Sequence, residues 1–172
     1  CATVNRGTSA TGKTIIGKNC LLMAYSHVAH DCNIGDNCVI VNGVALAGHV
    51  TIGDFAILGG NSAVHQFVTI GRYTMISGGS LVRKDVPPFV KAAREPLSYI
   101  GINSIGLRRR GFTEEKINEI QDIYRILFQK KNNNSQAILK IEAELKSTPE
   151  RDEIISFIKN SGRGIMKGYN QK

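Results

Sequence analysis

A small set of polar side chains recurs in this chain at spacings that could bring them into one reactive site. The set comprises His30, Asp31, His49, His65 and Gln66. Because an imidazole titrates near neutral pH, His30 could serve as a general base, with Asp31 orienting it or stabilising its charged form. Alternatively, the imidazoles could bind a metal ion such as zinc. Either chemistry requires a fold that gathers these residues from separate parts of the chain.

A six-residue hydrophobic repeat runs through the first half of the chain and indicates such a fold. A small or β-branched residue follows each aliphatic residue by four positions, and Ile-Gly recurs every 18 residues from Ile16 to Ile70. Three hexads per turn describe a three-sided prism, a parallel β-helix in which each coil covers its neighbours. Glycine is expected where φ is positive or where two segments approach closely. The aliphatic positions are Ile16, Leu22, Val28, Ile34, Ile40, Leu46, Ile52, Leu58, Val64, Ile70, Ile76 and Val82.

The β-helix is expected to span residues 1–88, with an α-helical domain over residues 89–172. Val4 and Ala10 continue the register towards the N-terminus. At 86–88, two prolines remove ladder donors and should end the array. A β-sandwich would instead show a hydrophobic alternation of period two, which fits badly.

Beyond the prolines, the hydrophobic period changes to that of helices. Residues 89–96 are expected to form a connector, and residues 163–172 a basic, loosely held tail. Thr148 and Pro149 are residue types favoured at the start of a helix. Four helices are expected. The first covers 97–110, the second begins after Thr113, the third begins after Ser135, and the fourth runs from Thr148-Pro149 to Ser161-Gly162.

An 18-residue coil allows positions to be stacked by subtraction. His30, Gly48 and Gln66 then form one column through three coils, and Asp31 and His49 form the adjoining column. Since coils are about 5 Å apart, the imidazoles converge on one corner of the prism. Gly48 has no side chain, so its N–H can approach a reacting carbonyl as an oxyanion donor.

Two further columns carry little side-chain bulk. They form either a groove that accepts an extended chain or corners in which glycine and asparagine relieve backbone strain. The sequence leaves both interpretations open. The columns are Asn42, Gly60 and Gly78, and Gly43, Asn61 and Gly79.

The chain is basic, with 22 Lys and Arg against 14 Asp and Glu, and a formal net charge of +8. Such a surface favours an anionic partner: a nucleotide, nucleic acid, an acidic protein or a membrane surface. The Arg108-Arg109-Arg110 cluster could bind phosphates or simply end a helix favourably. No apolar run of 18 residues occurs, so no transmembrane segment is expected. Cys20 and Cys38 stack one coil apart, and free thiols in a reducing cytoplasm are favoured over a disulfide.

Five motifs together resemble one known family, the acyl-[acyl-carrier-protein]–UDP-N-acetylglucosamine O-acyltransferases. These enzymes catalyse the first step of lipid A biosynthesis in Gram-negative bacteria, and this chain looks like roughly the last two thirds of one. The alternatives are an N-acyltransferase acting on UDP-3-O-acylglucosamine, which matches less well, and a zinc hydratase of the γ-carbonic-anhydrase type. The motifs are His27-Val28-Ala29-His30-Asp31-Cys32, Leu46-Ala47-Gly48-His49-Val50, Ala63-Val64-His65-Gln66-Phe67, Asp85-Val86-Pro87-Pro88 and Arg109-Arg110-Gly111-Phe112.

The resemblance implies a left-handed β-helix and a cytoplasmic homotrimer with active sites between subunits. It implies no metal, no cofactor and no nucleic-acid partner. The implied reaction transfers an (R)-3-hydroxyacyl group from acyl carrier protein to the glucosamine 3-hydroxyl of UDP-N-acetylglucosamine. His30 would deprotonate that hydroxyl with support from Asp31, and the Gly48 N–H would stabilise the oxyanion. Met75 and Gly78 match the acyl-chain groove of the family. The implied substrate-binding residues are His27, His49, His65, Gln66, Asn103, Arg109 and Arg110.

Overall fold

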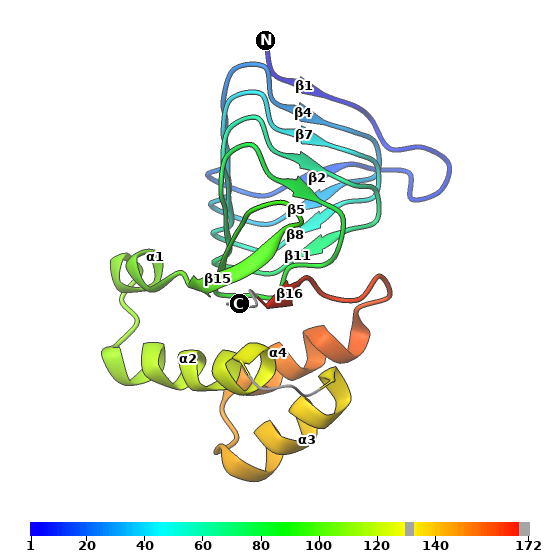
Figure 1. Cartoon of the computed structure of the whole chain (residues 1–172). Helices are drawn as coiled ribbons and strands as arrows, with labels where there is room; N and C mark the ends of the chain where they lie inside the picture. Colours follow the sequence, from blue (N-terminus) through cyan, green and yellow to red (C-terminus); the bar gives the residue numbers. More distant parts are fainter. Residues whose placement is uncertain (130–132, 169–172) are drawn as a thin grey trace.

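The computed structural model describes residues 1–129 and 133–168, which form a prism of stacked coils followed by helices (Figure 1). Two-residue strands make the walls of the prism, and between residues 15 and 82 each strand pairs in parallel with the strand 18 residues later. The predicted β-helix with three hexads per coil is therefore confirmed.

Three walls result from this pairing, and each is one sheet. The first wall contains β1 (Thr3–Val4), β4 (His27–Val28), β7 (Ala45–Leu46), β10 (Ala63–Val64) and β13 (Leu81–Val82). The second contains β2 (Ile15–Ile16), β5 (Asn33–Ile34), β8 (Thr51–Ile52) and β11 (Thr69–Ile70). The third contains β3 (Leu21–Leu22), β6 (Val39–Ile40), β9 (Ile57–Leu58) and β12 (Met75–Ile76), and later strands extend it.

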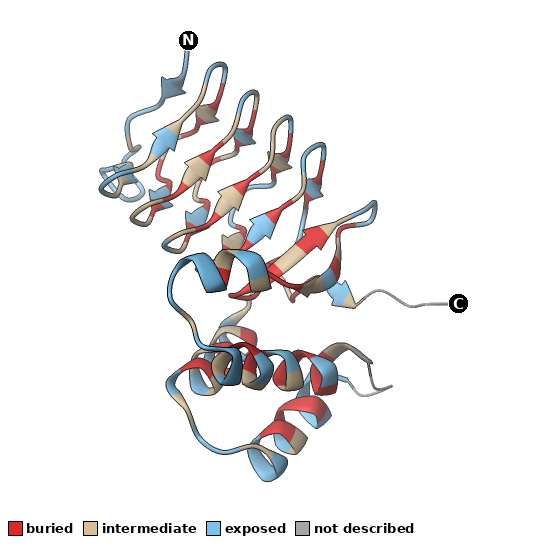
Figure 2. Ribbon diagram, turned by 90° about the vertical axis from the view of Figure 1, so that its left-hand side faces the viewer, coloured by how far each residue is buried: buried red, intermediate tan, exposed pale blue. Residues whose placement is uncertain are grey.

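The aliphatic residue of each hexad points into the prism, where the coils above and below cover it. From Val28 to Val82 these positions are buried, as are the residues four places after them (Figure 2). Ile16 and Leu22, near the N-terminal end of the array, are only partly covered. All four cysteines are free thiols, as predicted for Cys20 and Cys38.

The corners of the prism are residues with positive φ, and they recur every six residues without interruption. Nine of these eleven corners carry a side chain, although the left-handed conformation costs a non-glycine residue roughly 1 kcal/mol or more. Stacking between coils must offset that cost, because no coil would keep its corners alone. The corner residues are Asn19, Tyr25, Asp31, Asn37, Gly43, His49, Phe55, Asn61, Phe67, Tyr73 and Gly79.

The Ile-Gly glycines serve close approach, the second of the two predicted reasons. A Cβ added at Gly53 would lie 2.6 Å from the Arg72 backbone nitrogen, and one at Gly71 would lie 2.4 Å from the Pro88 nitrogen. Any side chain at these positions would force neighbouring coils apart.

The first coil is interrupted by a loop, so the N-terminal register differs from the prediction. Val4 pairs with Val28, 24 residues later and not 18. Residues 5–14 leave the wall as a projecting loop, drawn in blue in Figure 1, and Ala10 is exposed on it. Val4 thus occupies the same strand position as the inward-pointing Val28. The prediction that Ala10 continues the register was wrong.

Strand pairing continues past the prolines at 87–88, and the predicted connector at 89–96 and helix at 97–110 were wrong. β14 (Val90–Ala93) pairs in parallel with β12, and β15 (Ser98–Ile102) returns antiparallel to it. Ala92 is paired with Ile76 and is buried, so β14 covers an end of the core that would otherwise meet water. Only Ser104–Arg109 is helical there (α1), with Asn103 as its N-cap.

Three longer helices follow: α2 (Glu114–Gln129), α3 (Asn134–Glu144) and α4 (Pro149–Asn160). Thr148 caps α4 with Pro at its start, as predicted, but Asn133 and not Ser135 caps α3. The buried Tyr124 hydroxyl on α2 donates to the Pro88 carbonyl at 2.6 Å and ties the helices to the last coil. Within the described residues, no helix combines the length and apolar character needed to cross a bilayer.

The segment after α4 is more ordered than predicted. Ile165 bridges to Asp85, and β16 (Lys167–Gly168) pairs with β15. Ile165 and Met166 are buried, so the predicted loose tail was wrong for residues 163–168. The rest of that predicted tail, 169–172, lies outside the described residues.

Candidate active site

The predicted column of site residues exists at the corner between the first and second walls. Asp31 lies between β4 and β5, and His49 lies one coil further, between β7 and β8. The His49 N–H donates to the His30 carbonyl at 3.1 Å, and the Phe67 N–H donates to the Gly48 carbonyl at 3.2 Å. Three corner residues, Asp31, His49 and Phe67, therefore stand in successive coils, each with φ between 61° and 64°.

His30 and Asp31 form a hydrogen-bonded pair in which the two side chains differ sharply in exposure. His30 Nδ1 lies 2.8 Å from Asp31 Oδ2; the Asp31 side chain is 0% exposed and that of His30 42% exposed. The pKa of the Asp31 carboxyl lies well below its usual value, because hydrogen bonds from Thr11, Thr8 and His30 outweigh the opposing effect of burial. An ionised carboxylate accepts the Nδ1 proton, which leaves Nε2 of His30 free to take a proton from a substrate.

The projecting loop supplies partners for Asp31 that the sequence analysis missed. The Thr8 N–H donates to Oδ1 at 2.9 Å and the Thr8 hydroxyl to Oδ2 at 2.6 Å, while the Thr11 hydroxyl makes a short bond to Oδ1. The Thr14 hydroxyl accepts the Asp31 N–H at 2.9 Å. Thr8, Thr11 and Thr14 are spaced three apart, a signal whose meaning appears only when Asp31 is placed beside them.

His49 is held between the His30–Asp31 pair and Phe67. Its ring packs edge-on to the His30 ring at 5.2 Å and stacks on the Phe67 ring at 4.6 Å. His49 Nε2 lies 3.7 Å from Asp31 Oδ2, beyond hydrogen-bond range but close enough for electrostatic attraction if the ring is charged. Phe67 was not among the predicted site residues, although its 18-residue spacing from His49 marks it as the next corner.

Gly48 lies against the His30 ring, and no other residue type fits there without movement. A Cβ at this position would lie 2.6 Å from His30 Cε1 and 2.7 Å from Nε2. The Gly48 N–H makes no hydrogen bond within the described part of the chain. An N–H without a partner can donate to an oxyanion that forms beside the imidazole.

The remaining histidines and Gln66 lie nearby but less centrally. His27 Nδ1 lies 2.7 Å from the Thr3 hydroxyl. His65 and Gln66 stand in the coil after Gly48, where His65 Nδ1 lies 3.1 Å from the Gln66 carbonyl. In the described ranges His65 makes no ring contact with the other imidazoles, so only His30 and His49 meet directly.

The predicted nucleotide-contacting residues lie at a different corner, between the second and third walls. There the rings of Phe55, Tyr73 and Phe89 form a stack. The Arg110 guanidinium lies 4.7 Å from the centre of the Phe55 ring, and Arg109 ends α1 beside it. Asn103 is buried and already engaged, since its Nδ2 donates to the Tyr73 carbonyl at 2.9 Å and its Oδ1 caps α1.

The predicted acyl-chain residues lie at or beside the third corner. Met75 is on β12, and Gly78 precedes Gly79, which is a corner residue with φ 71°. Gly43 and Asn61, stacked with Gly79, have φ 68° and 57°. Of the two interpretations left open by the sequence, backbone strain at corners accounts for this column.

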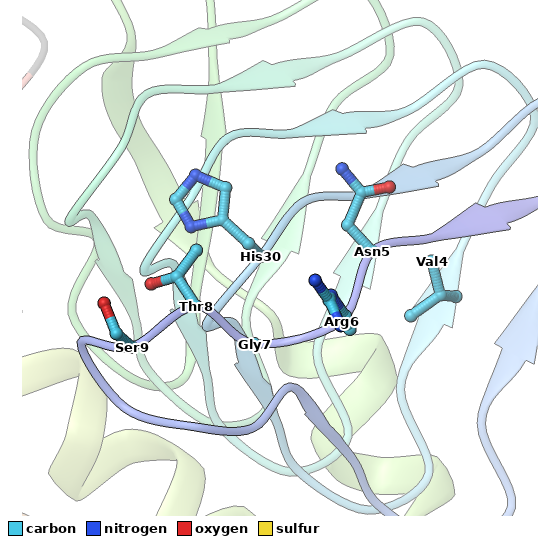
Figure 3. Close-up of a pocket in the computed structure, with 7 residues that line it drawn as sticks. All are labelled: Val4, Asn5, Arg6, Gly7, Thr8, Ser9 and His30. Atoms are coloured by element: carbon cyan, nitrogen blue, oxygen red, sulfur yellow. The ribbon is translucent and has the colours of Figure 1, made fainter.

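An open hollow of about 890 Å³ lies beside His30 (Figure 3). Its walls are the imidazole of His30 and the loop segment from Val4 to Ser9. The half-exposed His30 imidazole therefore faces a space large enough for a small organic group.

His30, Asp31 and His49 also offer metal-ligand atoms within 4.8 Å of one another. Four hydrogen bonds already reach the Asp31 carboxylate, from Thr8 twice, Thr11 and His30. A metal ion would have to displace these hydrogen bonds. The residues therefore fit a histidine oriented by a carboxylate better than a metal centre.

Comparisons with known proteins show which family the chain is similar to. The family described as "Udp N-acetylglucosamine O-acyltransferase; Domain 2" matches residues 85–166, and "Bacterial transferase hexapeptide (six repeats)" matches residues 13–48. An acyl-[acyl-carrier-protein]–UDP-N-acetylglucosamine O-acyltransferase of Chlorobaculum parvum is 59% identical over 99% of this chain and 66% of its own length.

Two solved structures are similar to the whole described fold. A UDP-N-acetylglucosamine acyltransferase from Bacteroides fragilis has a TM-score of 0.92 at 50% identity, over 94% of this chain and 63% of its own. One from Campylobacter jejuni has a TM-score of 0.88 at 33% identity, over 98% of this chain and 68% of its own. The chain thus spans about two thirds of the length of these relatives.

Proposed function

Because this chain belongs to the UDP-N-acetylglucosamine O-acyltransferase family, we propose that it transfers a 3-hydroxyacyl group from acyl carrier protein to the glucosamine 3-hydroxyl of UDP-N-acetylglucosamine. The observation that carries the proposal is the arrangement of His30, Asp31 and Gly48. It combines an imidazole with a free nitrogen, a buried carboxylate that fixes its tautomer, and an unpaired N–H beside it.

In the proposed mechanism, His30 Nε2 removes the proton from the 3-hydroxyl as the sugar oxygen attacks the thioester carbonyl. The Gly48 N–H donates to the oxyanion that forms on that carbonyl. Collapse of the tetrahedral intermediate breaks the carbon–sulfur bond, and the departing thiolate takes the proton from the His30 imidazolium. Asp31 stabilises the imidazolium throughout but keeps no proton itself.

Assembly of three subunits would explain why the predicted site residues lie at three corners. His30 and Gly48 lie at the corner between the first and second walls, Arg110 lies at the second–third corner, and Gly78 lies beside the third–first corner. One subunit cannot bring these corners together. In a homotrimer with its active sites between subunits, neighbouring prisms would supply the missing groups to each site.

The charge of the chain suits the proposed partners. Acyl carrier protein is acidic and UDP carries two phosphates, so both would be attracted to a surface with a net charge of +8. The proposed place of action is the cytoplasm, where the enzyme would begin lipid A biosynthesis. We assign no metal to the reaction, because a metal ion at Asp31 would have to displace the hydrogen bonds from Thr8, Thr11 and His30.

The proposal is tested with the full-length protein, UDP-N-acetylglucosamine and a mixture of acyl-carrier-protein thioesters, with mass spectrometry of the products. We expect a 3-O-acylated UDP-sugar, and we expect His30→Ala to abolish its formation while the oligomer stays folded. Turnover by that variant at the wild-type rate would refute the assignment of the base.

The same preparation distinguishes the alternatives. Acylation of the 2-amino group of UDP-3-O-acylglucosamine, with none of UDP-N-acetylglucosamine, would identify an N-acyltransferase. One zinc ion per site, together with hydratase activity that is lost on chelation, would identify a hydratase.

A further inference from the structure

The projecting loop holds the Asp31 carboxylate through three hydrogen bonds, and we propose that Thr11 and Thr8 are positioning residues for the His30 base. The inference rests on the proposed acyltransferase function. It assigns to residues 5–14 a catalytic purpose that the repeat pattern does not reveal.

The bonds leave the carboxylate a single orientation. Oδ1 accepts from the Thr8 N–H and the Thr11 hydroxyl, while Oδ2 accepts from the Thr8 hydroxyl and from His30 Nδ1. A carboxylate has about four acceptor positions, so every one is used. Rotation of the carboxylate would break loop bonds on both oxygens, and Oδ2 therefore stays directed at His30.

The loop also excludes water from the carboxylate. Thr8 and Thr11 are themselves exposed residues, yet the Asp31 side chain beneath them is 0% exposed. In Figure 3, Thr8 lies directly beside the imidazole of His30. The hydroxyl of Thr11 is also within 3.1 Å of the Lys13 carbonyl, but its one proton goes preferentially to the charged acceptor.

The loop is built as a fixed support and not as a swinging lid. The Gly12 N–H donates to the Thr8 carbonyl at 2.7 Å, with Gly12 at φ 75°. Gly7 packs so closely that a Cβ there would lie 2.1 Å from the Lys13 nitrogen. On the far side, the Thr14 hydroxyl accepts the Asp31 N–H. The threonines thus approach Asp31 from a loop that folds back on itself.

The test compares Thr11→Val, which removes the hydroxyl at nearly constant shape, with Thr11→Ser, which keeps it. Thr51→Val is the matched control, because Thr51 is exposed on β8 and lies outside the loop that holds Asp31. In the full-length enzyme, we expect Thr11→Val to lower kcat on the order of tenfold with KM for the UDP-sugar changed less than twofold. Thr8 also lines the hollow, and Thr8→Val should lower kcat at least as much.

The pH profile separates positioning from mere packing. In Thr11→Val the carboxylate is no longer fixed towards Nδ1 of His30 and stabilises the imidazolium less, so the acid limb of kcat should move downward by about half a pH unit. Thr11→Ser should return both kcat and the limb to wild-type values. An unchanged profile in Thr11→Val, or a serine variant as impaired as the valine variant, would overturn the inference.

A second measurement remains informative even if no acyltransferase activity is found, in which case the proposed function fails on its own. The chain has four histidines, so ¹⁵N-labelled imidazoles can be assigned one by one with His→Gln variants. We expect His30 to be protonated at Nδ1 in the wild type and to become a mixture of tautomers in Thr11→Val. The same tautomer in both proteins would overturn the inference independently of turnover.

Discussion

Replacing Gly48 with alanine would place a methyl group against the imidazole of His30. The new Cβ would lie 2.6 Å from Cε1, so the ring must retreat by about 0.8 Å to reach ordinary contact at 3.4 Å. Misplacement of a reacting group by about 1 Å can cost about 100-fold in rate, and we expect a loss of kcat of that order. Because a ring at the end of a side chain can move, the free energy of unfolding should change by less than about 1 kcal/mol.

The assay is the steady-state release of the carrier protein's thiol, with Gly162→Ala as a control, since a Cβ there meets no atom within 4 Å. Alanine keeps the backbone N–H, so the loss reports the displaced base and not a missing oxyanion donor. In a His30→Ala background there is no ring to displace, and Gly48→Ala should then cause no further loss. Activity of Gly48→Ala within threefold of the wild type would refute the reasoning.

Three further outcomes are expected. Arg110→Ala should raise KM for the UDP-sugar about tenfold while the exposed Arg83→Ala does not, as steady-state kinetics would show; equal effects would contradict a nucleotide contact. Tyr124→Phe leaves the Pro88 carbonyl without its buried donor and should lower the free energy of unfolding in urea by about 1–3 kcal/mol. The pKa of Asp31 is lower in the folded protein than in the unfolded chain, so its contribution to stability is complete well above pH 3.8 and declines as the pH falls below it. The difference in free energy of unfolding between the wild type and Asp31→Asn should therefore shrink as the pH falls. A constant difference from pH 6 to pH 2 would contradict this.

The repeat made the walls of the prism predictable, because each inward residue has one function, burial between coils, and one spacing. It also made the stacking of His30, Gly48 and Gln66 predictable, since a column follows from an 18-residue coil by arithmetic. The register failed at Ala10 for a physical reason. A small apolar residue satisfies the pattern whether it faces the core or lies on a loop, and only the pairing of Val4 with Val28 reveals that residues 5–14 have left the wall.

The C-terminal errors arose where tertiary contacts override local preference. Val90–Ala93 is flanked by prolines and has no periodic partner in sequence, so it resembled a connector. It is a strand because Ala92 covers Ile76 at the end of the prism. Asn103 matched a substrate-contact pattern, yet its amide is engaged by the Tyr73 carbonyl and the start of α1. Its proposed contact with UDP must therefore use whatever hydrogen-bonding capacity those bonds leave.

The position of the candidate site at a corner of the prism has a consequence for how its side chains are aimed. Asp31 and His49 have positive φ, a conformation that neither residue prefers, and Phe67 continues it one coil further. The coil-to-coil bonds from His49 to His30 and from Phe67 to Gly48 hold that backbone whatever the side chains are. Asn37 and Asn61 occupy equivalent corners with the same backbone but carry amides, which do not titrate. The direction of each side chain is therefore a property of the stacked coils, and a corner residue can be chosen for reactivity at little cost to the fold.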